Sequence, residues 1–320
     1  MKKILLILCA FTLITACENE PLDPAFTGGG NNNGGGNGNS DDLTLSKYEL
    51  DITLNTSFFG IPIESITKTD YFLEENSPGY GEIESTVTSF GVSETVNETQ
   101  TVEVNPNGQV ISFLSINSLG QTTNNTTITY DGNNITNITY NYYFEEPDEE
   151  EEDYEYNFSY NGNTITRTEV GTTISTVFTL DENNRFFKKE SFDDGTLILS
   201  ETVTFNEDGN CVTSVTTGDN NLNITYSYDN FENPIPNQIY NLGNTLSILN
   251  DDYEDTLGDA LSHDFASKNC IATSINGESY NFDVTYDNSN RISTRAYEIS
   301  LEADGVSLTT GFNEIFTYAN

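Results

Sequence analysis

The sequence predicts an all-β protein: a long antiparallel meander curled into a half-barrel or barrel, with one short amphipathic helix. Strong helix formers are scarce, whereas Thr, Asn, Tyr, Phe, Ile and Val are abundant, and this balance favours strands. Turn dipeptides recur along the chain beyond Leu43, and stretches of alternating apolar and polar residues lie between them. The roughly 280 residues beyond the N-terminal region are enough to bury one large core.

The turns are marked by dipeptides of Asn or Asp followed by Gly, which favour tight hairpins because both central residues must accept a positive φ. There are seven: Asn107-Gly108, Asp131-Gly132, Asn161-Gly162, Asp194-Gly195, Asp208-Gly209, Asn276-Gly277 and Asp304-Gly305. Similar segments, each an apolar residue followed by an Asx-rich turn, begin at residues 104, 130, 160, 180 and 205. Each interval therefore holds about two strands of roughly 8 to 10 residues.

The strands have one apolar face. Ile138, Tyr140 and Tyr142 alternate with Thr and Asn, and Tyr154, Tyr156, Phe158 and Tyr160 alternate with Glu, Asn and Ser. This period of two predicts an aromatic and aliphatic core face opposite a polar face. The polar face indicates a sheet exposed to water, in contrast to the apolar outer band of a membrane porin.

One segment departs from this period. Between Asp251 and Lys268, the residues Tyr253, Leu257, Leu261 and Phe265 recur every four positions, with acidic residues at the start and Lys268 at the end. That arrangement predicts an amphipathic helix with charges that complement its dipole. We expect the helix to lie over an end or edge of the sheet and to cap it.

The N-terminus predicts the location of the protein. Lys2 and Lys3 precede an apolar run from Ile4 to Ile14 that is too short to span a bilayer, and Thr15-Ala16 precede Cys17. Leu13-Ile14-Thr15-Ala16-Cys17 resembles the bacterial lipobox, which implies that Cys17 becomes the acylated first residue of the mature protein. The prediction is a signal peptide over residues 1–16, an anchor and tether over 17–41, and a β-meander domain over 42–320.

The tether from Thr27 to Ser40 is almost entirely Gly and Asn, a composition that gives a flexible linker with a reach of about 25 to 30 Å from Cys17 to Asp42. We expect lipid anchoring to the outer membrane. Glu18, Glu20 and Asp23 resemble the acidic surface-export signals of Bacteroidota lipoproteins, which would place the protein on the cell surface. The alternative is an ordinary solvated linker.

The charge of the chain limits its partners. Removing Lys2 and Lys3 with the signal peptide leaves 9 basic and 51 acidic residues, a formal charge of −42. Such a surface repels nucleic acid and anionic lipid headgroups, so we predict no nucleic-acid partner and contact with the membrane only through the lipid on Cys17. A glycan, a peptide or another envelope protein remains open as a partner.

Three segments carry a resemblance to a known family. They are Tyr228-Asp229-Asn230-Phe231-Glu232-Asn233-Pro234, Ser267-Lys268-Asn269-Cys270 and Phe282-Asp283-Val284-Thr285-Tyr286-Asp287. Over about residues 100 to 320 the chain resembles a Bacteroidota lipoprotein family of unknown function with YD-repeat-like hairpins and a porin-like all-β fold. The resemblance implies an architecture and brings no assigned activity.

Motifs of common catalysts are missing. His263 is the single histidine, and its position beside Asp264 predicts a solvent-exposed ring instead of a general base. The chain has no Gly-x-Ser-x-Gly, His-x-x-x-His or Cys-x-x-Cys motif. Cys211 and Cys270, 59 residues apart, form either a disulfide or two separate buried thiols.

Carboxylates are the remaining candidates for catalytic or metal-binding groups. With 51 acidic residues in the chain, two carboxylates can lie close together almost anywhere by chance. A pair of the glycosidase type is therefore no evidence for glycan hydrolysis. The segment Glu145–Asp153 is the densest run of acidic residues in the chain. Ca²⁺ prefers oxygen ligands of this kind. The candidate calcium ligands are Glu149, Glu150, Glu151, Glu152 and Asp153. The glycine and the alternating ligand spacing of a calcium loop are missing, so the sequence favours a solvated hairpin tip and no cofactor.

The sequence therefore predicts a lipid-anchored, non-enzymatic envelope protein that displays a binding or scaffolding surface, with no catalytic residues. Two alternatives stay open. One is a carboxylate-dependent glycan hydrolase, which needs two acids about 5 to 10 Å apart in a cleft and one raised pKa. The other is a carrier of a small apolar ligand inside the curl, which needs an unfilled cavity.

Overall fold

A computed structural model describes residues 44–58, 61–73, 80–143, 153–218, 221–235, 246–303 and 306–319. Within these ranges, nineteen strands form one sheet. The first ten strands are β1 (Leu45–Phe58), β2 (Ile61–Phe72), β3 (Tyr80–Ser89), β4 (Val92–Val104), β5 (Val110–Asn117), β6 (Thr122–Asp131), β7 (Asn134–Tyr142), β8 (Tyr154–Asn161), β9 (Thr164–Glu169) and β10 (Ile174–Leu180).

The remaining strands are β11 (Phe186–Asp193), β12 (Thr196–Phe205), β13 (Cys211–Gly218), β14 (Leu222–Glu232), β15 (Lys268–Ile275), β16 (Glu278–Asn281), β17 (Asp283–Tyr286), β18 (Ile292–Ala303) and β19 (Val306–Tyr318). Two short helices, α2 (Leu246–Asn250) and α3 (Leu257–His263), lie between β14 and β15. Neither is long and apolar enough to cross a membrane, and the same holds for every helix in the described ranges.

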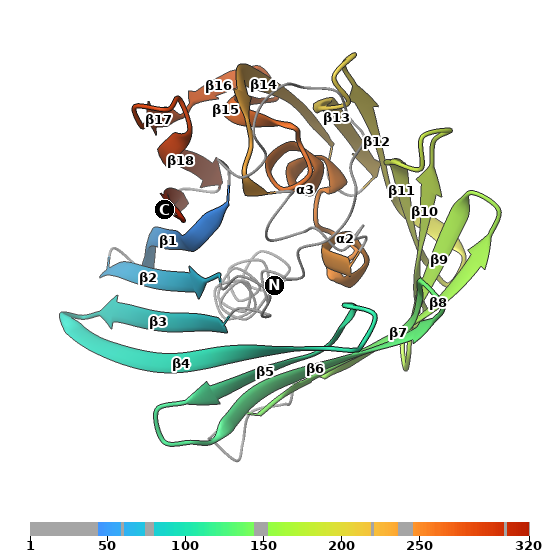
Figure 1. The fold of residues 1–320 in the computed structure, drawn as a ribbon, viewed down its shortest axis with the longest axis horizontal. Helices are drawn as coiled ribbons and strands as arrows, with labels where there is room; N and C mark the ends of the chain where they lie inside the picture. Colours follow the sequence, from blue (N-terminus) through green and yellow to red (C-terminus); the bar gives the residue numbers. More distant parts are fainter. Residues whose placement is uncertain are drawn as a thin grey trace.

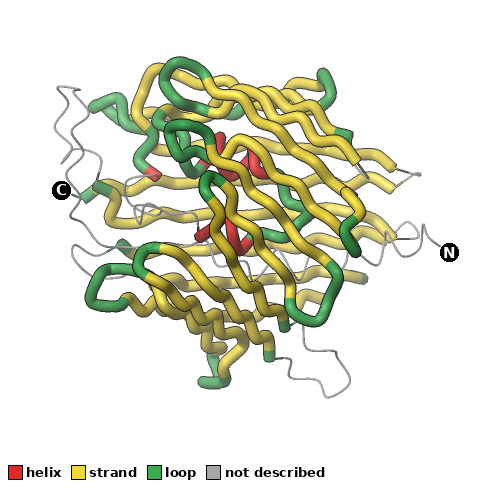
Figure 2. The backbone as a smooth tube through the Cα atoms, turned by 90° about the vertical axis from the view of Figure 1, so that its right-hand side faces the viewer, coloured by secondary structure: helices red, strands yellow, loops and turns green. Residues whose placement is uncertain are grey.

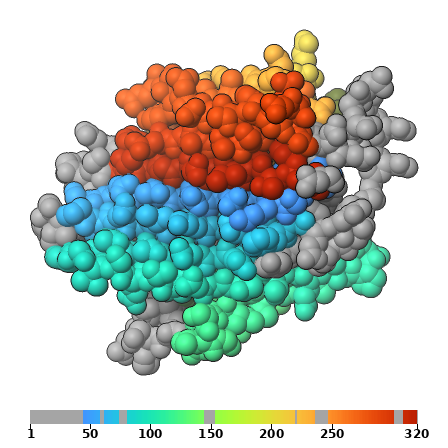
Figure 3. All heavy atoms as spheres, turned by 60° about the vertical axis from the view of Figure 1, so that its left-hand side comes forward, coloured from blue at the N-terminus to red at the C-terminus, as the bar shows by residue number. Residues whose placement is uncertain are grey.

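The sheet curls into a nearly closed barrel (Figure 1). Almost every strand pairs antiparallel with the next one in the chain, and β1 pairs with both β2 and β19, with Tyr48 opposite Phe316. Figure 3 shows the first and last strands side by side, blue against red. The ladder is interrupted where β16 pairs with β15 and β17 pairs with β18. The predicted all-β antiparallel meander is confirmed, and it closes further than a half-barrel.

Two of the seven predicted Asx-Gly turns form as their residues predict. At Asp194-Gly195 and at Asn276-Gly277 both residues have positive φ, between 46° and 92°, as a tight two-residue turn requires. At four others, Asn107-Gly108, Asp131-Gly132, Asn161-Gly162 and Asp208-Gly209, only the glycine has a positive φ, and Asp304-Gly305 lies outside the described residues. Longer turns use an Asx side chain instead: Asp181 Oδ1 accepts hydrogen bonds from the backbone N–H groups of Asn183 and Arg185 at 2.8 and 2.9 Å. These local bonds fix the geometry of the turn, which helps to set the register of the two strands that it joins.

The two faces of the strands differ as predicted. Ile138, Tyr140 and Tyr156 are buried toward the barrel interior, where Tyr140 stacks on Tyr154 with ring centroids 4.8 Å apart. Asn157, next along the chain, is exposed on the outer face. Hydroxyl pairs join neighbouring strands on exposed positions, as between Thr129 and Thr136 at 3.0 Å. The outer wall is therefore built from small polar groups.

The predicted helix from Asp251 to Lys268 is wrong in extent and position. Residues after α2 form a turn in which Asp252 N donates to Asp255 Oδ2 at 2.8 Å and Asp252 Oδ1 accepts from Glu254 N at 3.1 Å. Such side-chain bonds compete with helical ones, so α3 begins only at Leu257, and Lys268 already belongs to β15.

The helices lie inside the ring of strands and do not cap an edge (Figures 1 and 2). Here α3 packs against β11, β12, β13 and β15. Leu249, Leu257 and Leu261 join the same buried cluster as Phe178 and Ile224 of the wall. The apolar residues that recur every four positions thus contact the inner wall of the barrel. A local sequence pattern cannot predict which part of the fold they contact.

A first prediction follows from the strand faces. Tyr156 is 4% exposed, and Tyr156→Asp would bury a carboxylate in an apolar cluster at a cost of several kcal/mol. Asn157→Asp is the matched control on the exposed face, where a substitution usually changes stability by less than about 0.5 kcal/mol. Thermal unfolding of both variants checks the register, and equal shifts in the midpoint would contradict it.

Candidate functional site

Two basic side chains hold the helical segment inside the barrel. Arg167 of β9, 2% exposed, donates through Nη1 to the carbonyl oxygens of Leu249, at 3.0 Å, and Asp251. Lys189 of β11 donates through Nζ to the carbonyl oxygens of Asp252 and Asp255 at 2.8 and 2.7 Å. These bonds satisfy carbonyl groups at and after the end of α2 that the helix itself leaves unpaired.

A buried carboxylate holds the other end of this segment. Glu201 of β12 is fully buried and accepts from the backbone N–H groups of Leu257 and Gly258, both at 2.8 Å, and from Ser214 Oγ at 2.6 Å. It therefore caps α3, where a negative charge is favourable. Burial raises the pKa of Glu201, while these hydrogen bonds oppose the increase.

The approach of α3 to the wall requires a glycine. A Cβ at Gly258 would lie 2.5 Å from Ser214 Cβ and 2.9 Å from the Tyr226 hydroxyl oxygen. Tyr226 itself donates to Asp259 Oδ1 at 2.6 Å. The helix and the wall are thus fitted to each other, and together they fill this side of the barrel.

A second buried cluster lies at the seam between β18, β19 and β1. Arg295 is 1% exposed and pairs through Nε and Nη2 with both carboxylate oxygens of Glu314, the second bond being 2.6 Å long. Tyr48 donates to Glu314 Oε1 at 2.7 Å. Burial alone would raise the pKa of Glu314, but Arg295 and Tyr48 hold it below its ordinary value.

His263 is not the solvent-exposed residue that the sequence predicts. Its ring is partly buried and stacks on Phe282 and Tyr297, with centroids 5.7 and 5.9 Å apart. Burial, helped by the charge of Arg295, lowers the pKa of His263 to about 4. The prediction failed because α3 turns inward and carries His263 with it.

The segments that carry the family resemblance meet in space. Asp229 accepts hydrogen bonds from Asn269 Nδ2, at 3.1 Å to Oδ2, and from the Tyr286 hydroxyl. Asn233, 2% exposed, donates to the carbonyl oxygens of His263 and Ala266 at 2.8 and 3.2 Å. These polar residues join the chain after α3 to the barrel wall, so their role is structural.

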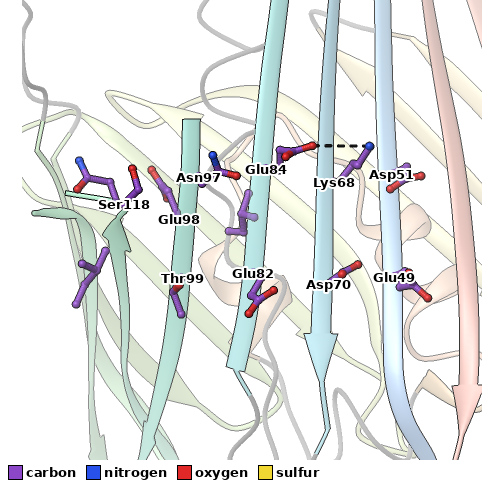
Figure 4. Close-up of a pocket in the computed structure, with 13 residues that line it drawn as sticks. Glu49, Asp51, Lys68, Asp70, Glu82, Glu84, Asn97, Glu98, Thr99 and Ser118 are labelled. Atoms are coloured by element: carbon purple, nitrogen blue, oxygen red, sulfur yellow. Dashed lines mark ion pairs between the residues drawn. The ribbon is translucent and has the colours of Figure 1, made fainter. Parts of the chain in front are cut away.

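The outer face carries an acidic groove of about 570 Å³, defined by the residues of β1 to β5 that line it (Figure 4). Lys68 is the one basic residue of its lining, and it lies 3.7 Å from Glu84. Nearby, Lys47 pairs with Glu49 and Asp70 at 2.9 and 2.8 Å. The groove is lined by these carboxylates of the outer face: Glu49, Asp51, Asp70, Glu82 and Glu84; Glu98, from the inner face of β4, also contributes to its lining. Its charge favours cationic partners and repels anions.

The remaining sites predicted from sequence have separate outcomes. Cys17 and Glu149 to Glu152 lie outside the described residues, while Asp153 is exposed and accepts from the Tyr142 backbone N–H at 2.9 Å. Cys211 and Cys270 are two buried free thiols, so the alternative without a disulfide holds. Across the described ranges, no group of three His, Cys, Asp or Glu side chains is arranged to hold a metal ion.

Sequence reasoning missed the buried cations. Arg167, Lys189 and Arg295 are each at most 2% exposed, although basic residues are normally at the surface. A signal was present, because Arg167 follows the inward-facing Ile165 by two positions and so shares its face. The period of two predicts that Arg167 points inward. It cannot identify the hydrogen-bond acceptors of Arg167, which come from a segment about 80 residues away.

Comparisons with known proteins give no function. No family model matches the chain, and no curated protein matches it. A porin-like protein from Bacteroides uniformis is 13% identical over 87% of this chain and 98% of its own, with a TM-score of 0.44. A structure of TcdB2–TccC3–Cdc42 is 14% identical over 75% of this chain and 14% of that one, with a TM-score of 0.28.

Proposed function

We propose that this chain is a lipid-anchored protein of the cell envelope whose barrel stands in water and displays a non-enzymatic binding surface. The observation that carries the proposal is the polar outer wall. Exposed hydroxyl pairs such as Thr204 with Thr213, at 2.5 Å, and the acidic groove over β1 to β5 occupy the face that a membrane-spanning barrel covers with apolar side chains. Membrane attachment therefore needs a separate device, and Cys17 provides it.

The helical segment inside the barrel (Figure 1) supports binding over transport through the barrel. Arg167, Lys189 and Glu201 fix the α2–α3 segment within the ring of strands through at least six hydrogen bonds to its backbone. Releasing it would deprive three buried charges of most of their hydrogen bonds, which is costly. The barrel therefore acts as a rigid scaffold.

The carboxylates also favour binding over glycan hydrolysis. Burial raises the pKa of Glu98, as a general acid requires. Its neighbour on the same face of β4 is Glu94, four residues away, or about 13 Å along an extended strand. That spacing exceeds the roughly 5 to 10 Å of a hydrolase pair. In the outer groove, Glu49, Asp70 and Glu84 form ion pairs with lysines.

The anchoring part of the proposal predicts a clear change in partitioning. Cys17→Ala removes the acylated residue, and the remaining mature chain has a strongly negative charge and no apolar anchor. We expect the variant to move from the detergent phase to the aqueous phase in a temperature-induced phase separation, because one or two acyl chains supply the membrane affinity.

Cys9→Ser is the control, because Cys9 lies within the predicted signal peptide and leaves with it. This variant should partition like the wild type and incorporate labelled fatty acid equally. Retention of the Cys17→Ala variant in the detergent phase would contradict lipid anchoring through this residue.

A further inference from the structure

A second hollow, of about 210 Å³, opens on the inner face of β3 and β4 and adjoins the acidic groove, with which it shares Ile83 and Glu98. Ile83, Val87 and Val96 form its apolar sides, and Tyr142 of β7 also lines it. Val87 and Val96 remain 38% and 48% exposed. Exposed β-branched side chains gathered around a concavity are a feature of ligand sites.

Two carboxylates lie among these apolar side chains. Glu98 is directly opposite Ile83 in the ladder, and Glu94 is directly opposite Val87, so both share the face of the hollow. Among the described residues that line this hollow, none is a lysine or an arginine. Its negative charge is thus uncompensated within the lining.

Glu98 is the more buried of the two carboxylates. Its Oε2 atom is inaccessible to water. Burial raises the pKa of this carboxyl group, and a hydrogen bond with the Thr123 side chain opposes the increase only in part. A charged donor stabilises a carboxylate more than a neutral hydroxyl does, so an ammonium group placed among the valines would stabilise the ionised form further.

We propose that this hollow binds a small amphiphilic amine, whose ammonium group pairs with Glu98 while its aliphatic body packs on Val87 and Val96, with Glu94 adding negative charge to the site. The size sets the class of ligand, because about 210 Å³ is below the roughly 300 to 1,000 Å³ of sites for larger ligands. Tyr142 adds an aromatic ring to the site, which favours a cation over a neutral alcohol where the two meet.

This inference deepens the proposed binding role by naming a ligand class, and it does not depend on the lipid anchor. Loss of partitioning in Cys17→Ala and loss of amine binding are separate results. An anionic protein also attracts cations non-specifically, so the experiment must distinguish the hollow from the general field.

The test is calorimetric titration of the protein with n-hexylammonium at about 150 mM salt, which screens distant charges. We expect saturable binding, with n-hexanol and hexanoate binding at least tenfold more weakly. Glu98→Gln should weaken n-hexylammonium about tenfold or more, as expected for a charged hydrogen bond. Glu94→Gln should have a smaller effect, because Glu94 is exposed to solvent whereas Glu98 is partly buried.

Glu103→Gln is the matched control, because Glu103 is an exposed residue of the same strand that points to the outer face. It should bind the amine like the wild type. Circular dichroism of each variant verifies the fold. Absence of saturable binding, equal binding of n-hexanol, or equal losses in Glu98→Gln and Glu103→Gln would each overturn the proposal.

Discussion

Glu314→Ala should destabilise the barrel by about 3 to 5 kcal/mol, because it leaves the guanidinium of Arg295 buried without its partner. Arg295 is 1% exposed and Glu314 is 4% exposed, so solvent screens the pair little. Tyr48 loses its acceptor as well. Denaturant unfolding measures the change, and Glu298→Ala, on an exposed position of the neighbouring strand, should have almost no effect.

The same pair sets a pH dependence. Because the folded-state pKa of Glu314 lies below its ordinary value, its contribution is present above the unfolded-state pKa and is lost as the pH falls through the folded value. The wild type should lose more stability on acidification than Arg295→Met/Glu314→Leu, whose apolar pair should restore most of the stability at neutral pH. A double variant as unstable as Glu314→Ala would contradict this explanation.

Glu201→Ala should loosen the helical segment and destabilise the protein by about 3 kcal/mol. Three buried donors, the N–H groups of Leu257 and Gly258 and the Ser214 hydroxyl, lose their acceptor, and each unpaired buried group costs about 1 to 3 kcal/mol before relaxation. Hydrogen exchange should accelerate first over α3, because its N-terminal cap is removed.

Glu207→Ala is the control for this change, since Glu207 is exposed in the turn between β12 and β13. It should alter neither stability nor exchange. If the α3 amides of Glu201→Ala exchange at the wild-type rate, the carboxylate does not hold the segment inside the barrel.

Local features of the fold were predictable because they depend on neighbours in the sequence. Asp194-Gly195 and Asn276-Gly277 form tight turns for steric reasons that two residues settle. The inward side of Tyr140 and Tyr156 follows from a period of two. Closure of β1 on β19 is different, because it joins residues about 270 apart and no local pattern specifies it.

The interior was not predictable for the same reason. The spacing of Leu257 and Leu261 correctly indicates a helix with an apolar face, yet the face alone does not say which wall it contacts. Arg167 and Glu201 bond to backbone groups, which carry no sequence signal of their own. The hollow beside Glu98 likewise depends on the ladder register and on Tyr142 from another hairpin.

The central claim, that a tether holds a water-exposed barrel at the membrane, can be tested directly by cysteine labelling in intact membranes. Thr202→Cys and Asn157→Cys place a thiol on the exposed outer wall, and Ser214→Cys places one at a fully buried inner position. With a charged maleimide, the two outer thiols should react at the same rate before and after detergent is added, and the inner one should not react. Outer thiols that react only after solubilisation would show a wall covered by lipid and contradict the claim.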